Sequence, residues 1–243
     1  MKKFVIGNWK ELPETQAQAR EVVERVDQWL QETPTADVSI VLCPPDKYLH
    51  DVADWMKQGR LADVAQLGVQ DVTGGAEELG VRYVIIGHSD RRWKLGEPDD
   101  VVNGKLKATL RAGLVPIVCL GERTREPGWQ DALATQVRLT FAGLSDPDVT
   151  RCMVAYEPVW AISTNPGAKP DTPASAVQSM GLIRQALEDS FGASHATFLY
   201  GGSVTPANAR EFLQRPEVSG VLVGGASVRP EDFVGILTIA ATL

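Results

Sequence analysis

The 243-residue sequence predicts an α/β fold, namely one closed (β/α)8 barrel that spans residues 1–243 as a single domain. Eight short apolar runs rich in Val and Ile recur along the chain, and their apolar residues are nearly continuous, as in strands buried on both faces. Amphipathic helical patterns separate several of these runs. A barrel of this kind needs about 250 residues, so one barrel accounts for almost the whole chain.

The strands are expected in regular order along the chain. Their predicted ranges are Phe4–Trp9, Val38–Cys43, Val64–Gln70, Tyr83–Gly87, Leu114–Leu120, Cys152–Glu157, Thr197–Gly201 and Gly220–Gly224. An open doubly wound sheet is the competing fold. It would usually carry a glycine-rich fingerprint after its first strand, where this chain has Gly7-Asn8-Trp9-Lys10.

Helical spacing of apolar residues predicts amphipathic helices between the strands. The clearest segments are Glu14–Gln31, Ala174–Glu188, Pro206–Gln214 and Pro230–Ala241. Two of them are preceded by a threonine and a proline, at Thr172-Pro173 and Thr205-Pro206. Threonine as N-cap followed by proline in the first helical position is a strong start signal.

Composition narrows the classes of function. A formal net charge of −7 argues against a nucleic-acid partner, which needs a basic face. The chain has no run of the roughly 18 to 20 apolar residues that crosses a bilayer, and polar residues interrupt the N-terminal apolar run, so we expect no membrane partner. Three cysteines without paired spacing predict neither a disulfide framework nor a zinc site, and they fit a cytoplasmic protein.

In such a barrel the chemistry lies at the carboxyl ends of the strands. Glu157 ends an apolar run, so its carboxylate is poorly solvated, which favours a role as general base; pairing with an Arg or Lys is the structural alternative. His88 also ends an apolar run, and Ser89 to Arg92 would open a helix whose N-terminus disfavours imidazolium. A purely structural role for His88, and a solvated surface position for Lys10, remain the alternatives.

Two glycine turns predict a phosphate site. Tyr200-Gly201-Gly202-Ser203 and Val223-Gly224-Gly225-Ala226-Ser227 follow the seventh and eighth predicted strands. Glycine allows close backbone approach, and barrels often bind phosphate in these two loops. Tight connections without a ligand are the alternative.

Taken together, these motifs resemble the triosephosphate isomerase family over essentially the whole chain, which implies a TIM barrel. The motifs that carry the resemblance are Gly7-Asn8-Trp9-Lys10, Gly87-His88-Ser89-Asp90-Arg91-Arg92, Cys119-Leu120-Gly121-Glu122, Tyr156-Glu157-Pro158-Val159-Trp160-Ala161-Ile162, Tyr200-Gly201-Gly202-Ser203-Val204 and Leu222-Val223-Gly224-Gly225-Ala226-Ser227.

The resemblance implies a role for each matching residue. Glu157 is implied as the base and His88 as the neutral electrophile, a role established for this family. Lys10 would supply positive charge, Asn8 would bind substrate oxygens, and Asp90 would support the site. The implied phosphate-binding residues are Ser163, Ser203, Gly224 and Gly225, and the implied lid residues are Pro158, Val159, Trp160, Ala161 and Ile162. The resemblance implies a small phosphorylated sugar as the ligand and neither a metal nor an organic cofactor.

Four departures from the family pattern stand out. Asp90 replaces a glutamate, and Leu12 replaces an asparagine. The lid segment from Ser163 to Asp171 is a few residues longer and richer in proline. Between the third and fourth strands, only Asp71 to Gly80 replaces the long loop that family members insert into a partner subunit. We therefore expect a monomer or an altered homodimer.

The leading hypothesis is the interconversion of D-glyceraldehyde 3-phosphate and dihydroxyacetone phosphate through an enediolate. The same chemistry on a tetrulose phosphate is the close rival, because a remodelled lid and a lost loop could accompany a changed substrate. A phosphosugar-binding barrel without catalysis is the third possibility, although a binder needs no base.

Overall fold

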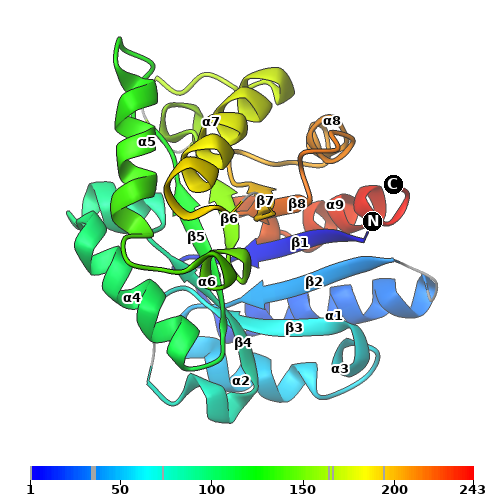
Figure 1. Ribbon diagram of the computed structural model, residues 1–243. Helices are drawn as coiled ribbons and strands as arrows, with labels where there is room; N and C mark the ends of the chain where they lie inside the picture. Colours follow the sequence, from blue (N-terminus) through cyan, green and yellow to red (C-terminus); the bar gives the residue numbers. More distant parts are fainter. Residues whose placement is uncertain (1, 34–36, 73, 164, 166, 194) are drawn as a thin grey trace. The chain divides into compact units, whose positions relative to one another are not determined.

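The eight strands, β1 to β8, follow one another in chain order in a closed barrel, with helices between them (Figure 1). The computed structural model describes residues 2–33, 37–72, 74–163, 165, 167–193 and 195–243. The predicted fold class is confirmed. The chain divides into two compact units, residues 1–83 with 204–243 and residues 84–203, and each is described by itself.

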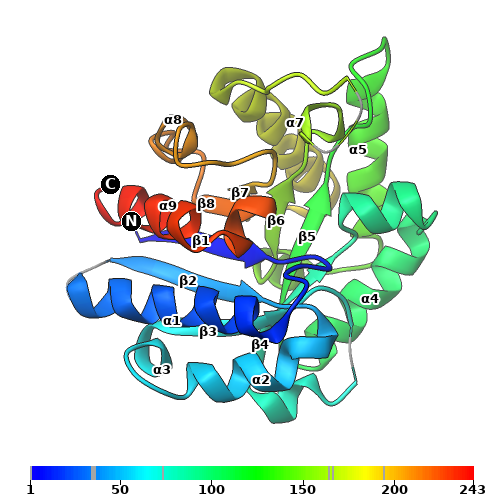
Figure 2. The same cartoon turned by 180° about the vertical axis from the view of Figure 1, so that it is seen from behind.

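The first unit holds strands β1 (Lys3–Asn8), β2 (Val38–Cys43), β3 (Ala65–Val69) and β8 (Gly220–Val223). β1 pairs in parallel with β2 and with β8, and β2 pairs with β3. Helix α1 packs against α2 and α9, and α9 also packs on β1 (Figure 2). The helices of this unit are α1 (Gln16–Glu32), α2 (Asp46–Met56), α3 (Leu61–Val64), α8 (Ala209–Leu213) and α9 (Pro230–Ala241).

The second unit holds β5 (Val115–Leu120), β6 (Met153–Tyr156), β7 (Thr197–Tyr200) and the carboxyl half of β4 (Val81–Ile86). β6 pairs in parallel with β5 and β7. Helix α5 packs between α4 and α7 (Figure 1). The helices of this unit are α4 (Asp99–Arg111), α5 (Trp129–Thr140), α6 (Asp146–Thr150) and α7 (Pro173–Phe191).

Local sequence explains where several elements begin. Thr172 caps α7 by accepting the Ser175 N–H, with Pro173 in the first turn, as predicted. Helix α9 has the predicted bounds. Helix α1 begins two residues later than predicted, because the Thr15 hydroxyl and the Gln18 side chain each accept a backbone N–H in a capping box.

The predicted start of the helix at Thr205-Pro206 is wrong. Helix α8 begins at Ala209, and residues 206–208 form a turn. In this turn the Asn208 side-chain oxygen accepts the Thr205 N–H at 2.8 Å, and the Ala209 N–H donates to the Thr205 carbonyl at 2.9 Å. Most strand ends also shift by one or two residues. β6 stops at Tyr156, so Glu157 lies just beyond the strand.

The three cysteines are free and buried, and burial raises the pKa of the Cys152 thiol to about 12. Such thiols are unreactive. No helix in the described part of the chain is long and apolar enough to cross a membrane.

Candidate active site

Glu157 lies buried directly after β6, with 3% of its surface exposed. Its Oε2 accepts the Ser89 N–H at 2.8 Å, and its Oε1 lies 3.1 Å from His88 Nε2. Its own N–H donates to the Leu120 carbonyl at 2.8 Å. The predicted base therefore meets the predicted electrophile, and its charge is balanced by hydrogen-bond donors.

The two neighbours of His88 indicate which ring nitrogen carries the hydrogen in the neutral form. The Asp90 N–H donates to Nδ1 at 3.1 Å, so Nδ1 acts as an acceptor and carries no hydrogen. The ring hydrogen of the neutral imidazole then belongs to Nε2, which points at Glu157. The segment after His88 is a short π-helical turn, Asp90–Lys94, and its first N–H meets the ring, as the sequence suggested. The Asp90 carboxylate itself pairs with Lys94 at 2.6 Å.

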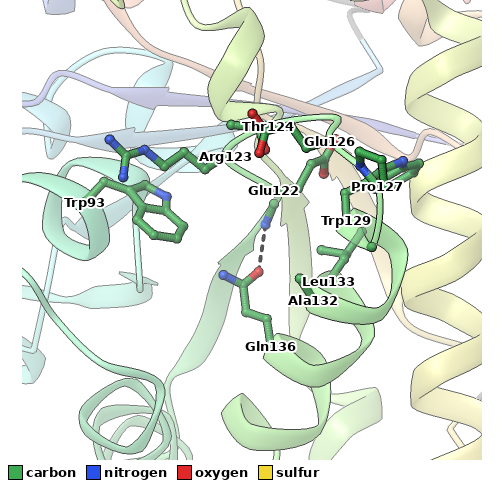
Figure 3. Close-up of a pocket in the computed structure, with 12 residues that line it drawn as sticks. Trp93, Glu122, Arg123, Thr124, Glu126, Pro127, Trp129, Ala132, Leu133 and Gln136 are labelled. Carbon is green, nitrogen blue, oxygen red and sulfur yellow. Dashed lines mark hydrogen bonds between the residues drawn. The ribbon is translucent and has the colours of Figure 1, made fainter.

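Gly121 allows the backbone of Glu157 to approach the end of β5. A Cβ atom at Gly121 would lie 1.8 Å from the Glu157 carbonyl oxygen. The Gly121 N–H donates to Gln136 of α5 at 2.9 Å, shown as the dashed line in Figure 3. Glycine at this position thus lets the Glu157 backbone lie close to the end of β5, and this helps to position the Glu157 side chain.

Two residues hold this region without having been predicted to do so. Arg92 is buried, and its Nε donates to the Gly87 carbonyl at 2.7 Å, next to His88. Glu122 is also buried and accepts hydrogen bonds from Tyr156 and Trp160. It lines a pocket of about 270 Å³ together with Trp93 and Trp129 (Figure 3). Glu122 belongs to one of the motifs that carry the family resemblance, but its hydrogen-bond partners are apparent only in the structure.

The predicted lid begins with a short 3-10 turn, Val159–Ala161. The Ser163 N–H donates to Ser203 Oγ at 2.8 Å, so two predicted phosphate-binding residues contact each other. Asn165 holds the turn through a 2.7 Å hydrogen bond from its side-chain amide to the Val159 carbonyl. Thr164 and Pro166, which belong to the lengthened lid, lie outside the described residues.

In the first unit, the backbone of Lys10 lies in the left-handed region, with φ at 54°. A non-glycine residue in this region costs about 1–3 kcal/mol and persists only where its surroundings enforce it. Asn8 is buried and accepts the Lys10 N–H at 3.1 Å, while Gln70 donates to the Lys10 carbonyl at 2.8 Å. These contacts set the direction of the lysine side chain.

The predicted phosphate turn after β8 lies beside this lysine. A Cβ atom at Gly224 would lie 3.6 Å from Lys10 Cε. The Ser227 hydroxyl donates to the Gly224 carbonyl at 2.7 Å, and Arg229 donates to the Gly225 carbonyl at 3.1 Å. The unit thus brings a lysine and a braced glycine turn together, as an anion site requires.

The predicted site residues therefore fall into two groups, one in each unit. The first unit holds Asn8, Lys10, Gly224 and Gly225, and the second holds His88, Asp90, Glu157, Ser163, Ser203 and residues 158–162. Among the residues that the structure describes, no group of three or more His, Cys, Asp or Glu could hold a metal ion.

The barrel places a buried carboxylate 3.1 Å from an imidazole nitrogen at its strand ends, which suits an enzyme that moves protons on its substrate, and the family match makes that class the isomerases. The chain matches the family described as Triosephosphate isomerase over residues 3–240. It belongs to the triosephosphate isomerase family.

Individual relatives agree with the family match. The chain is 39% identical to the triosephosphate isomerase of Synechococcus sp. (strain JA-2-3B'a(2-13)), over 98% of this chain and 97% of that protein. It is 38% identical to that of Roseiflexus sp. (strain RS-1), over 96% of each. It is 37% identical to that of Symbiobacterium thermophilum, over 98% of this chain and 96% of that protein.

The contact at Gly121 gives a testable prediction. Gly121→Ala should lower kcat about 100-fold, because the added methyl group must push the Glu157 backbone aside and misplacing a catalytic group by about 1 Å costs this much. Steady-state kinetics would measure the loss. Gly104→Ala in α4 is the control, since its Cβ would meet nothing within 4 Å. Equal activity of the two variants would contradict the proposed constraint.

Proposed function

We propose that this chain interconverts D-glyceraldehyde 3-phosphate and dihydroxyacetone phosphate by transferring a proton through an enediolate. The observation that carries the proposal is the contact of Glu157 with His88 Nε2, because this reaction needs a base and a neutral hydrogen-bond donor side by side. The name shared by the relatives, triosephosphate isomerase, supports the same substrate pair.

Glu157 acts as the base. It takes the proton from the carbon next to the carbonyl and returns it to the neighbouring carbon. Both of its oxygens engage the protein in this structure, one with the Ser89 N–H and one with His88. One of these hydrogen bonds must therefore break before the carboxylate reaches a substrate. Both partners are uncharged donors, so the exchange costs less than separating an ion pair would.

His88 acts as the electrophile. Its Nε2–H donates to the substrate carbonyl oxygen and moves protons between the two oxygens of the enediolate. Because Nδ1 accepts the Asp90 N–H, the hydrogen of the neutral ring stays on Nε2 and is the one donated to the substrate. A neutral donor matches the acidity of an enediol better than an imidazolium does.

The remaining residues bind the anionic parts of the substrate. Lys10 supplies positive charge, with Asn8 beside it. In the first unit, backbone N–H groups at Gly224 and Gly225 are the proposed phosphate donors. In the second unit, Ser163 and Ser203 carry the same expectation from the family resemblance, and there the Ser163 N–H donates to Ser203 Oγ at 2.8 Å. Residues 158–162 begin the lid that excludes water. We place the protein in the cytoplasm, where its three buried thiols stay reduced.

We predict that Glu157→Gln lowers kcat by several orders of magnitude, because the amide cannot accept the proton and the base supplies a whole chemical step. Glutamine keeps the shape of the side chain, so the fold should be unaffected. Isomerisation would be followed on triose phosphates and on tetrulose phosphates in parallel. Glu126→Gln, at an exposed position, is the matched control.

Each outcome of this experiment is informative. Unchanged turnover in Glu157→Gln would rule out Glu157 as the base and would favour a non-catalytic phosphosugar-binding barrel. If the normal protein has a much higher kcat/KM for a tetrulose phosphate than for the triose phosphates, the tetrulose phosphate would instead be the substrate.

We further propose that the protein is a monomer, or a homodimer with a different interface from that of its family. The support is the short segment between β3 and β4, whose described part contains a 3-10 turn, Ala76–Leu79, and the half-exposed side chain of Val72. Thr73 of this segment lies outside the described residues.

Sedimentation velocity at micromolar concentration would test the oligomeric state. We expect a monomer, or a dimer whose sedimentation is unaffected by Val72→Asp. The segment at residues 71–80 is too short to reach into a partner as a long loop does. A tight dimer that dissociates in this variant would contradict the proposal.

A further inference from the structure

Arg125, in the segment between β5 and α5, has an unusually large number of partners. Its Nε lies 2.8 Å from Glu122 Oε1. Its Nη2 lies 3.1 Å from the Tyr156 hydroxyl, 3.1 Å from Ser175 Oγ and 2.9 Å from Ser179 Oγ. Its guanidinium carbon lies 3.8 Å from the centre of the Trp129 ring and 5.2 Å from that of Trp160. The cation is thus held in one orientation.

The first end of the lid reaches Arg125 through Glu122. The Trp160 Nε1–H donates to Glu122 Oε1 at 2.9 Å, and the Val159 N–H donates to the Glu122 carbonyl at 3.1 Å. The side chain of Glu122 is only 3% exposed, so its charge needs a cation close by. Arg125 supplies that cation, and the position of Trp160 therefore depends on it.

The second end of the lid reaches the same guanidinium from α7. Asp171 precedes the helix, and its Oδ1 accepts the Thr172 N–H at 2.8 Å. The Ser175 hydroxyl also hydrogen-bonds to Asp171, and its oxygen accepts from Arg125 Nη2. Asp171 Oδ2 is buried and has no hydrogen-bond partner among the described residues, and the charge of Arg125 favours the ionised carboxylate, which burial disfavours.

We propose that Arg125 is a positioning residue that couples the two ends of the lid, residues 158–162 through Glu122 and Asp171 through Ser175. The inference rests on the proposed role of residues 158–171 as the lid. A guanidinium offers several donors in one rigid plane, so displacement of one end changes the hydrogen bonds available to the other. Lysine keeps the charge but cannot keep all of these contacts.

Double-mutant cycles on kcat/KM test the coupling. Trp160→Phe removes the Nε1–H at one end, and Ser175→Ala removes the hydroxyl at the other. With Arg125 present, we expect the double variant to differ at least threefold from the product of the single effects. In the Arg125→Lys background we expect the effects to multiply, and we expect Arg125→Lys alone to lower kcat/KM about tenfold. Arg138→Lys, an arginine on the exposed face of α5, is the control.

The outcomes separate a positioning role from a structural one. If the effects of Trp160→Phe and Ser175→Ala on kcat/KM multiply when Arg125 is present, the two ends of the lid are not coupled. If Arg125→Lys lowers the melting temperature but leaves kcat/KM and the coupling unchanged, Arg125 only stabilises the fold. Glu157→Gln distinguishes the two proposals: if it abolishes turnover while the cycles show no coupling, only the inference about Arg125 fails.

The pH dependence of the coupling gives a second test. The groups that face Asp171 are Arg125, Glu122, Tyr156 and Tyr200, besides the Thr172 N–H and the Ser175 hydroxyl. Burial raises the pKa of Asp171, so its carboxylate loses its charge at a higher pH than an ordinary aspartate does. The attraction for Arg125 is present above that pKa and is lost as the pH falls through it.

We therefore expect the coupling between Trp160→Phe and Ser175→Ala to shrink as the pH is lowered, and to be small at every pH in Asp171→Asn. Asp189→Asn, at an exposed position on α7, should behave like the normal protein. A coupling in Asp171→Asn that keeps its normal size and pH dependence would overturn the role of Asp171 in the second end of the lid.

Discussion

The Glu157 carboxylate is held by two donors that follow the same strand, the Ser89 N–H and His88 Nε2, while its backbone is held by Leu120 at the end of β5. Three consecutive strands, β4, β5 and β6, therefore converge on one side chain. Two other residues of this unit help to keep these strand ends in place. Gly121 lets β5 and Glu157 approach each other, and Arg92 fixes the turn that carries His88.

Hydrogen bonds to or from the backbone orient two of the predicted site residues, His88 and Lys10. The Asp90 N–H donates to His88 Nδ1 at 3.1 Å, and the Asp90 carboxylate, which pairs with Lys94, lies 3.5 Å from the same nitrogen. In the first unit, the Asn8 side chain and Gln70 hold the backbone of Lys10 in a strained conformation. In each unit, hydrogen bonds to the backbone therefore help to orient one predicted site residue, His88 or Lys10.

The sequence was informative where function depends on position along the chain. The strand-end positions of Glu157 and His88 predicted two side chains that the structure brings within 3.1 Å of each other, and the Val38–Cys43 strand and the Pro230–Ala241 helix have their predicted bounds. It was less informative where a contact joins distant segments. Arg125 lies in an irregular segment without a periodic pattern, and its partners are up to 54 residues away in the chain. The start of α8 is a different case, because the turn at residues 206–208 is built from local hydrogen bonds.

Two buried glutamates lie at neighbouring strand ends, and their partners differ. Glu122 and Glu157 are 6% and 3% exposed, so burial does not distinguish them. Glu122 pairs with the Arg125 cation and also accepts from Tyr156 and Trp160. A buried carboxylate leaves such an ion pair only at high cost. Glu157 instead contacts the Ser89 N–H and His88 Nε2. The partners, rather than the depth of burial, therefore distinguish Glu157, the base of the proposed reaction, from Glu122, which is held by its ion pair with Arg125.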